Sequence, residues 1–409
     1  MKFPKDFYFG ATTSSHQVEG GNFNNWSKWE KQNAQKLAQN ANENYKHLPN
    51  FKRIIKEAQK PQNYISAFAS DQIHRYKEDV QIMRESNFNA YRFSIEWSRI
   101  EPKNGEFSRS GLAYYQNLIN ELKKNRIEPF TTLWHWTMPI WFDELGGFSK
   151  RANVIHFLRF VKYVVKNLKG VKYYIVLNEP EVITNKSYIL GDWPPQKKSL
   201  VLGVRVLHNL IFAHNQSYKI IKEILPQSKV GIAKHNNYFE SYKNRPINKL
   251  IAKILDYFAN QYFIKKTIKY LDFIGLNYYF HRRIDIFGKQ ADNKKHSDMG
   301  WELYPWGLYH LLMDLKKYKK PLYITENGLA DAHDTHRAWY IKEALKSVQK
   351  AIKDGADVRG YLYWSLLDNF EWAEGFWPRF GLVAVDYKTG KRTIRPSAKI
   401  YAKIIKESS

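Results

Sequence analysis

The sequence contains no cysteine among its 409 residues. This absence excludes disulfide bonds, a thiol nucleophile and a thiolate metal site. It is compatible with a reducing compartment, and we expect the protein to be cytoplasmic. Residues 1–6 contain no apolar run of signal-peptide length. The most apolar window, residues 199–214, is interrupted by Arg205 and His208, so the sequence predicts no membrane span.

Acidic residues are scarce relative to basic ones. The sequence has 39 acidic and 65 basic residues, which gives a formal net charge of +26 at pH 7. Such an excess can indicate a nucleic-acid or anionic-membrane partner. Here the lysines are spread over most predicted helices, with no single basic arm and no nucleic-acid motif. We therefore interpret them as solvated helix faces and expect neither nucleic acid nor membrane as a partner.

The sequence also lacks a glycine-rich phosphate loop after an early strand, which an open doubly wound sheet would need. It has instead eight apolar segments that alternate with helical patterns. The predicted strands are residues 7–12, 90–95, 128–134, 171–177, 229–233, 273–279, 321–325 and 358–364. Eight such units that close on themselves form a (β/α)8 TIM barrel. We see no linker or internal repeat, and we expect residues 1–409 to form a single domain.

One polar stretch interrupts this alternation. Residues 22–70 are rich in Asn, Gln and Lys, and we expect them to form an insertion loop with a local helix at about 52–59. A loop in this position could shape the mouth of a site. The other predicted helices are residues 71–86, 111–125, 150–168, 200–224, 247–269, 305–318, 336–354 and 397–406.

Two of the predicted strands each end in a glutamate. The strand at 321–325 runs directly into Glu326, and the strand at 171–177 runs into Asn178 and Glu179. On a parallel barrel the carboxyl ends of all strands meet at one face, where two carboxyl groups can flank one bond. A solvated loop position would explain either glutamate alone, but the pair favours a two-carboxylate active site.

The same stretches carry a family resemblance. The segment Ile324-Thr325-Glu326-Asn327-Gly328 resembles the nucleophile motif of glycoside hydrolase family 1, the β-glucosidase family. The segment Leu177-Asn178-Glu179-Pro180 resembles the acid/base motif of that family. The resemblance extends from residue 7 to about residue 401. It implies the (β/α)8 fold, with Glu326 as the nucleophile and Glu179 as the acid/base.

Glycoside hydrolysis, the reaction that the resemblance implies, needs one ionised and one protonated carboxyl group. Arg92 lies at the carboxyl end of its strand, as Glu326 does, and its guanidinium would hold Glu326 ionised. A surface ion pair is the alternative for Arg92. Tyr279, at the end of the sixth strand, could donate a hydrogen bond to the same carboxylate. We expect a partly negative pocket to raise the pKa of Glu179, so that this residue can donate a proton.

Sugar binding requires partners for hydroxyl groups and a flat apolar surface for the ring. Residues 363–372 closely resemble the last sugar-binding loop of the family, although any one of its aromatic residues alone would more often be core. By the resemblance, the residues that bind sugar hydroxyls are Gln17, His135, Asn178, Glu371 and Trp372. The residues that line the site or supply apolar surface are Trp136, Asn277, Tyr279, Trp301, Trp364 and Phe380, with Trp364 as the platform and Trp301 on the leaving-group side.

Alternatives to this assignment remain at two levels. His135 could be a metal ligand, but no second ligand lies at a suitable spacing, so we expect no metal and no cofactor. Glu371 would repel a phosphate, whereas relatives that take 6-phosphorylated sugars have a Ser/Lys/Tyr phosphate site in this region. We therefore expect a retaining, exo-acting β-glycosidase for unphosphorylated β-D-glucosyl residues, with galactosyl and fucosyl residues as further candidates. A transglycosylase on the same site, or a non-catalytic barrel that binds sugar or nucleic acid, is the alternative.

Overall fold

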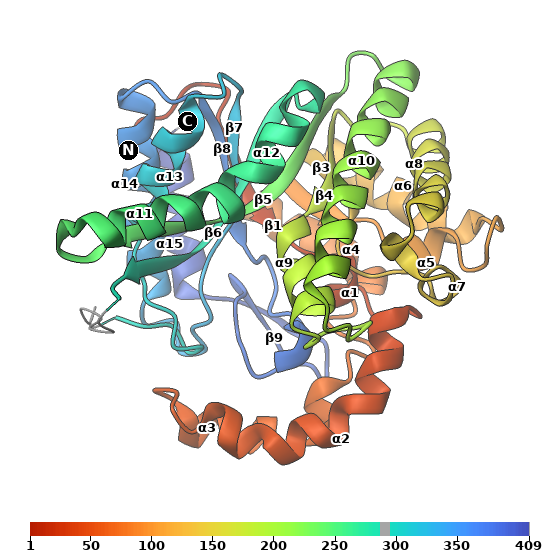
Figure 1. Cartoon of the computed structure of the whole chain (residues 1–409), viewed down its shortest axis with the longest axis horizontal. Helices are drawn as coiled ribbons and strands as arrows, with labels where there is room; N and C mark the ends of the chain where they lie inside the picture. Colours follow the sequence, from red (N-terminus) through yellow and green to blue (C-terminus); the bar gives the residue numbers. More distant parts are fainter. Residues whose placement is uncertain (287–294, 409) are drawn as a thin grey trace.

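The strands β1 to β8 close into a parallel barrel in the computed structural model, which describes residues 1–286 and 295–408 (Figure 1). The barrel strands are β1 (Tyr8–Thr12), β2 (Ala90–Ser94), β3 (Glu128–Trp134), β4 (Tyr173–Asn178), β5 (Lys229–Ser241), β6 (Phe273–Ile284), β7 (Leu322–Asn327) and β8 (Val358–Trp364). β8 pairs with β1 and closes the ring. Every residue of β2, β4 and β7 is buried, as parallel strands covered on both faces require. The predicted (β/α)8 fold is confirmed.

Helices surround the barrel on its outer side, where α8 packs beside α10 and α14 packs beside α13 and α15. The longer helices are α2 (Asn25–Tyr45), α3 (Phe51–Ala58), α4 (Gln72–Glu85), α6 (Arg109–Lys124), α8 (Val154–Asn167), α10 (Leu200–Ile224), α11 (Pro246–Asp256), α12 (Tyr262–Thr267), α13 (Gly307–Lys316), α14 (Arg337–Lys353) and α15 (Pro396–Ser408). The single-turn helices are α1 (Ser15–Val18), α5 (Trp97–Ile100), α7 (Ile140–Glu144) and α9 (Pro180–Ile183). In the described residues, no helix is both long and apolar enough to cross a membrane.

The interior of the barrel changes character along its axis. Aromatic and aliphatic side chains fill one end, where Phe130 stacks on Tyr173 with ring centroids 4.3 Å apart and Tyr323 packs beside both. Side chains alternate along a strand, so the residue two positions after inward-facing Ala90 also points inward. That residue is Arg92, which is fully buried. The apolar plug therefore supports a polar layer at the carboxyl ends of the strands.

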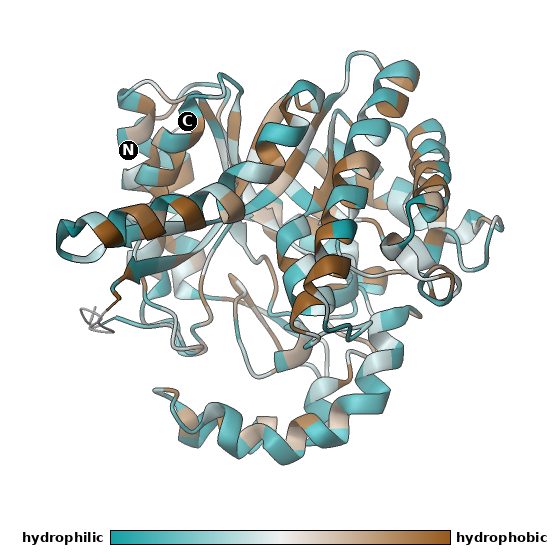
Figure 2. Ribbon diagram, in the orientation of Figure 1, coloured by the Kyte–Doolittle hydropathy of each residue, from teal (hydrophilic) through white to brown (hydrophobic). Residues whose placement is uncertain are grey.

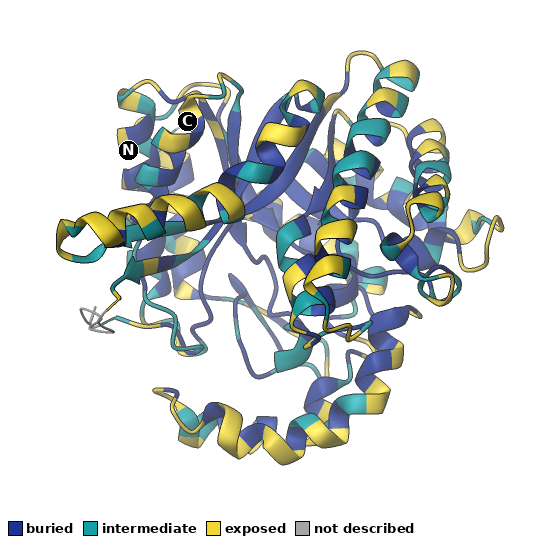
Figure 3. Ribbon diagram, in the orientation of Figure 1, coloured by how far each residue is buried: buried dark blue, intermediate teal, exposed yellow. Residues whose placement is uncertain are grey.

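The local helix expected at about 52–59 is confirmed as α3, but the rest of residues 22–70 is not mainly a loop, because residues 25–45 form α2. The side chain of Asn24 accepts a hydrogen bond from the backbone N–H of Ser27 and caps α2. The buried apolar residues of α2 are Trp26, Trp29, Ala34, Ala38, Ala41 and Tyr45. The intervening positions are rich in Asn, Gln and Lys, which obscures the apolar pattern and explains why the helix escaped prediction. Figure 3 shows exposed and partly buried residues between the buried ones along α2 and α3.

Strands β5 and β6 continue well beyond their predicted ends at residues 233 and 279. They stay paired up to Ser241 and Ile284, and so form a ribbon that rises past the rim of the barrel. Helix α11 packs beside this ribbon, and its outward face carries apolar residues (Figures 1 and 2). The single helix predicted at 247–269 is instead divided into α11, a π-helical turn and α12. A short hairpin of β9 (Val383–Val385) and β10 (Arg392–Ile394) follows β8 and was not predicted.

A buried ion pair fixes the segment that follows β8. Arg395 donates hydrogen bonds from both terminal guanidinium nitrogens to the two carboxylate oxygens of Asp368, each at 2.9 Å. Asp368 also accepts a hydrogen bond from the backbone N–H of Gly381 at 2.9 Å. The pair therefore connects the residue just before α15 to the loop that leads to Glu371 and Trp372.

We expect Arg395→Met to lower the free energy of unfolding by about 3–5 kcal/mol, because the Asp368 carboxylate would stay buried without its main cation. Urea unfolding measures this change. The matched control is Arg359→Met, which breaks an exposed pair with Asp357 that has similar geometry and should cost about 1 kcal/mol or less. Equal losses in the two variants would contradict the structural role of the buried pair.

Candidate active site

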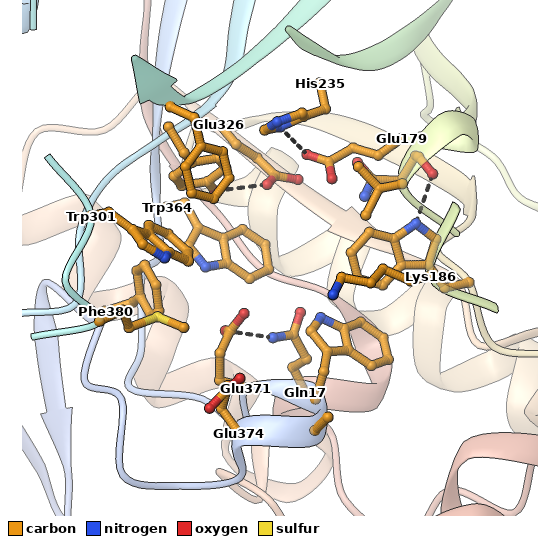
Figure 4. Close-up of a pocket in the computed structure, with 18 of the residues that line it drawn as sticks. Gln17, Glu179, Lys186, His235, Trp301, Glu326, Trp364, Glu371, Glu374 and Phe380 are labelled. Carbon is orange, nitrogen blue, oxygen red and sulfur yellow. Dashed lines mark hydrogen bonds and ion pairs between the residues drawn. The ribbon is translucent and has the colours of Figure 1, made fainter. Parts of the chain in front are cut away.

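A cavity of about 590 Å³ lies at the carboxyl ends of the barrel strands (Figure 4). Most of the residues expected at the site line it: Gln17, His135, Trp136, Asn178, Glu179, Tyr279, Trp301, Glu326, Trp364, Glu371, Trp372 and Phe380. The two that do not, Arg92 and Asn277, are fully buried behind the carboxylates. The structure thus brings all the predicted site residues into one place.

Glu326 sits near the end of β7, where the pairing with β6 shifts register. Leu276 pairs with Ile324, but the next residue, Asn277, pairs with Glu326, so Thr325 is skipped. Such a bulge turns a side chain away from its regular direction, and bulges are common beside active sites. Beyond the strand, a Cβ on Gly328 would lie only 1.8 Å from the carbonyl oxygen of Trp364, so no larger residue fits at the end of the motif.

Two hydrogen-bond donors, Arg92 and Tyr279, hold the Glu326 carboxylate. Arg92 Nη1 donates to Glu326 Oε1 at 2.5 Å, and the Tyr279 hydroxyl donates to Glu326 Oε2 at 2.9 Å. Arg92 is itself aimed by Thr132, which accepts from Nε at 2.9 Å, and by Asn178, which accepts from Nη2 at 2.7 Å. Burial raises the pKa of Tyr279, so its phenol stays protonated and available as a donor.

Glu179 follows β4 in a strained backbone conformation, with φ at 44°. Its backbone N–H donates to the carbonyl of Ala233 at 2.8 Å, which fixes this conformation. The side-chain amide of Asn277 donates to Glu179 Oε1 at 2.7 Å. His235 Nδ1 lies 3.6 Å from the same oxygen. The carboxyl group therefore projects into the cavity between Asn277 and His235 (Figure 4).

The two carboxyl groups influence each other's protonation. Burial raises the pKa of Glu326 to about 7; Arg92 opposes the increase and the nearby Glu179 adds to it. Burial also acts to raise the pKa of Glu179, but His235, Asn277 and Arg92 outweigh it and lower that pKa. This order is the reverse of our expectation from the sequence, which did not include His235. The lowering depends on the positive charge and hydrogen-bond donors beside Glu179, because burial acts in the opposite direction.

His135 has one ring nitrogen available for a ligand. Asn178 accepts from Arg92 through its oxygen, so its amide nitrogen is the donor to His135 Nε2, at 3.0 Å. Burial and Arg92 lower the pKa of His135, which keeps the imidazole neutral with its proton on Nδ1. That nitrogen is buried without a partner among the described residues, so it can donate to a sugar hydroxyl. The indole N–H of Trp136 donates to the backbone carbonyl of Asn178 at 3.0 Å, so this residue can contact a sugar only through its ring.

The floor of the cavity is a hydrogen-bonded carboxyl group. Gln17 and Asn369 donate to Glu371 Oε2 at 3.0 and 2.9 Å. Burial raises the pKa of Glu371 to about 8, so the group is largely protonated at neutral pH. Charge repulsion is then a weaker barrier to phosphate than the sequence suggested. Neither form of Glu371, however, supplies the cation that a phosphate group requires.

Aromatic rings form one wall of the cavity. Trp364 packs against Ala330 and Phe380, and the ring centroids of Trp301 and Phe380 are 6.0 Å apart. Figure 4 shows these three aromatic residues on one side, with Glu179, His235 and Lys186 opposite and with Gln17 and Glu371 below. A sugar ring can therefore stack on the wall while its hydroxyl groups reach the floor. Among the described residues there is no group of three His, Cys, Asp or Glu side chains that could hold a metal ion.

Several lining residues were not predicted. Among them are Lys186, Trp193, His235, Phe280, Arg282 and Glu374. His235 and Phe280 lie just past the predicted ends of strands 5 and 6, so extending the apolar pattern of those strands would have pointed to them. Trp193 packs against Trp136 with ring centroids 5.0 Å apart, but no motif in its surroundings indicated this.

Comparisons with known proteins agree with this geometry. Residues 1–270 and 249–409 match the family model "Glycosyl hydrolase family 1". The chain is 32% identical to a 1,4-beta-D-glucan glucohydrolase of Thermotoga neapolitana, with 100% of this chain and 99% of the relative covered. It is 33% identical to beta-glucosidase 13 of Arabidopsis thaliana, with 99% and 92% covered.

Solved structures show the same likeness. The beta-glycosidase from Pyrococcus horikoshii is 36% identical with a TM-score of 0.86, and 99% of this chain and 95% of that chain are covered. The beta-glucosidase from Thermotoga maritima in complex with glucoimidazole is 29% identical with a TM-score of 0.88, and 99% of each chain is covered. The chain therefore belongs to glycosyl hydrolase family 1.

Proposed function

We propose that the protein is a retaining, exo-acting β-glycosidase that hydrolyses terminal, unphosphorylated β-D-glucosyl residues. The observation that carries the proposal is the Glu326 carboxylate, which is fixed by Arg92 and Tyr279 in the cavity that Glu179 also enters. The names of two relatives, a 1,4-beta-D-glucan glucohydrolase and a beta-glucosidase, support glucose as the sugar. Galactosyl and fucosyl residues are further candidates.

In the first step Glu326 acts as the nucleophile. One of its carboxylate oxygens attacks the anomeric carbon, while Glu179 gives its proton to the departing glycosidic oxygen. The leaving group departs as an alcohol, and the sugar is held as an ester on Glu326. Tyr279 and Arg92 orient the carboxylate that attacks. Positive charge that develops on the sugar ring is stabilised by the remaining carboxylate oxygen.

In the second step Glu179 acts as the base. Formation of the ester removes the negative charge of Glu326, so one influence that raises the pKa of Glu179 disappears. The ionised Glu179 then takes a proton from water, and the hydroxide oxygen attacks the anomeric carbon. The ester bond breaks, Glu326 regains its charge, and the sugar leaves with its original β configuration because two inversions have occurred.

The sugar would be positioned by groups that take no part in bond making. Gln17, Glu371 and His135 offer donors and acceptors to hydroxyl groups, and Trp364 offers a flat surface to the ring. Asn178 is oriented by Arg92 and His135 and would bind a sugar hydroxyl next to the reacting carbon. Because these groups close the cavity at its floor, they support binding of a terminal residue rather than an internal one.

A transglycosylase and a non-catalytic barrel are the two alternatives to a hydrolase. A transglycosylase would use the same site, with a sugar in place of water. A non-catalytic barrel would bind sugar or nucleic acid, and it would show no turnover of aryl β-glucosides. We propose a small-molecule β-glycoside as the substrate, with no nucleic-acid or membrane partner. We also propose a cytoplasmic location, which cell fractionation would test.

Replacement of Glu326 by Gly should abolish hydrolysis, because no ester can form. Azide should then enter the space left by the side chain and attack an activated β-glucoside from that face. The expected product is the α-glucosyl azide, which proton NMR identifies by its anomeric coupling. Substantial hydrolysis by the purified Glu326→Gly variant would show that another group is the nucleophile.

Replacement of Glu179 by Ala should separate substrates by leaving group. Dinitrophenolate needs little proton donation, so its departure should be nearly unchanged, whereas cellobiose should be cleaved roughly 10²–10⁴-fold more slowly. Pre-steady-state kinetics measures the two departures. Azide should rescue the second step and give the β-glucosyl azide, the opposite anomer to that of Glu326→Gly. Equal losses on both substrates, without rescue, would mean that Glu179 binds the sugar or supports the fold.

A further inference from the structure

Among the described residues, one guanidinium group that lines the cavity has no acidic partner. Arg282 lies on the extension of β6 and is solvent-exposed. Within residues 1–286 and 295–408, no Asp or Glu forms an ion pair with it. Its neighbour Arg283, by contrast, pairs with Glu240 at 3.2 Å and with Glu302 at 3.0 Å. Desolvation lowers the pKa of Arg282, and no nearby carboxylate offsets that effect.

Arg282 is held in place by an aromatic ring. Its guanidinium carbon lies 4.7 Å from the ring centroid of Phe280, which also lines the cavity. Phe280 in turn packs against Trp301 with ring centroids 4.6 Å apart. The planar guanidinium is thereby presented beside the ring of Phe280. This arrangement leaves its N–H groups free to meet an anion.

Arg282 lies farther from the bottom of the cavity than the sugar that would react. Tyr279, on the same strand, bonds to Glu326 at the bottom of the cavity. Arg282 follows Tyr279 by three residues, and at about 3.3 Å per residue its Cα lies about 10 Å farther out. That distance exceeds the width of one sugar ring, so a group bound at Arg282 belongs to the leaving group. Phe280 and Trp301 lie between the two positions.

The acidic groups on this side of the cavity are already balanced. Glu302 binds Arg283 and lies 3.3 Å from His281. Burial raises the pKa of Glu374. The lysine of the lining, Lys186, is paired with Asp192 at 2.8 Å. In the part of the chain that the structure describes, the Arg282 guanidinium is therefore a cation of the lining without an ion pair.

We infer that the leaving-group side of the cavity recognises β-glucosides whose leaving group is a ring carrying an anionic group, with the ring against Phe280 and Trp301 and the anion on Arg282. This inference rests on the proposed β-glucosidase function and narrows its substrate class. A guanidinium can donate two parallel hydrogen bonds to a carboxylate or a sulfate, and such charge-assisted bonds are stronger than neutral ones.

A matched pair of substrates tests the inference: 4-carboxyphenyl β-D-glucoside and its methyl ester. They differ in the anionic group but keep the same ring and the same glucose. We expect Arg282→Gln to lower the carboxylate-to-ester ratio of kcat/KM about 10-fold, the lower end for a charge-assisted hydrogen bond because Arg282 is exposed. Arg282→Lys keeps the charge without the fork and should lose less. Added salt should lower kcat/KM for the carboxylate but hardly for the ester.

The control variant is Lys162→Gln on α8, which removes one positive charge from an exposed helix position outside the cavity. It should leave the carboxylate-to-ester ratio unchanged. An unchanged ratio in Arg282→Gln, or the same decrease in Lys162→Gln, would overturn the inference while leaving the β-glucosidase proposal intact. No turnover of either substrate by the unaltered protein would overturn both.

Discussion

The buried ion pair between Arg92 and Glu326 is the interaction on which the site depends. The Arg92 side chain is fully buried and that of Glu326 is 5% exposed, so each charge has lost nearly all of its water. A buried pair of this kind costs desolvation energy and is retained only where further hydrogen bonds satisfy both groups. Thr132, Asn178 and Tyr279 supply those bonds here. The ion pair and these hydrogen bonds together fix the direction of the reacting carboxylate.

Closed barrel geometry makes this pair possible. Arg92 comes from β2, Asn178 from β4 and Glu326 from β7, and only a barrel brings the ends of these three strands around one point. The aromatic plug around Phe130 and Tyr173 fills the opposite end and keeps the strands apart at the required spacing. Packing at one end of the barrel thus supports polar chemistry at the other.

Local irregularities complete the site. The pairing of β6 with β7 skips Thr325 next to Glu326, and the pairing of β4 with β5 shifts between Ile175 and Asn178, just before Glu179. Glu179 itself has a left-handed backbone. Backbone strain of this kind costs stability and persists only where surrounding contacts hold it. An irregular backbone therefore occurs at both carboxyl groups, a register shift at Glu326 and a left-handed residue at Glu179, which indicates that their orientation departs from the regular geometry of the sheet.

Much of the barrel could be predicted because its strands are continuous apolar runs. The eighth strand was predicted at 358–364, the bounds that the structure gives. The two glutamate motifs were equally visible, since each follows such a run. Helix α2 was missed because its many Asn, Gln and Lys residues obscure the spacing of its few apolar ones. The order of the two carboxyl pKa values was also missed, because it depends on His235, a neighbour of Glu179 in space but not in sequence.

The proposed role of Arg282 could not be predicted from the sequence either. Its role follows from the length of the β5–β6 ribbon and from the lack of an acidic partner among the described residues, and neither can be read from a motif. The high positive charge of the chain gave no indication of which cation faces the cavity. Only the structure separates the solvated lysines of the outer helices from the one arginine that lies beside Phe280.

Trapping of the covalent intermediate tests the central claim most directly. With 2-deoxy-2-fluoro-β-D-glucosyl fluoride, the electron-withdrawing fluorine at C2 slows both steps, while the good leaving group lets the ester form and accumulate. Mass spectrometry of the intact protein and of its peptides then locates the label. The account predicts one fluoroglucosyl group per chain, on the peptide that contains Glu326. A label on any other residue would contradict it.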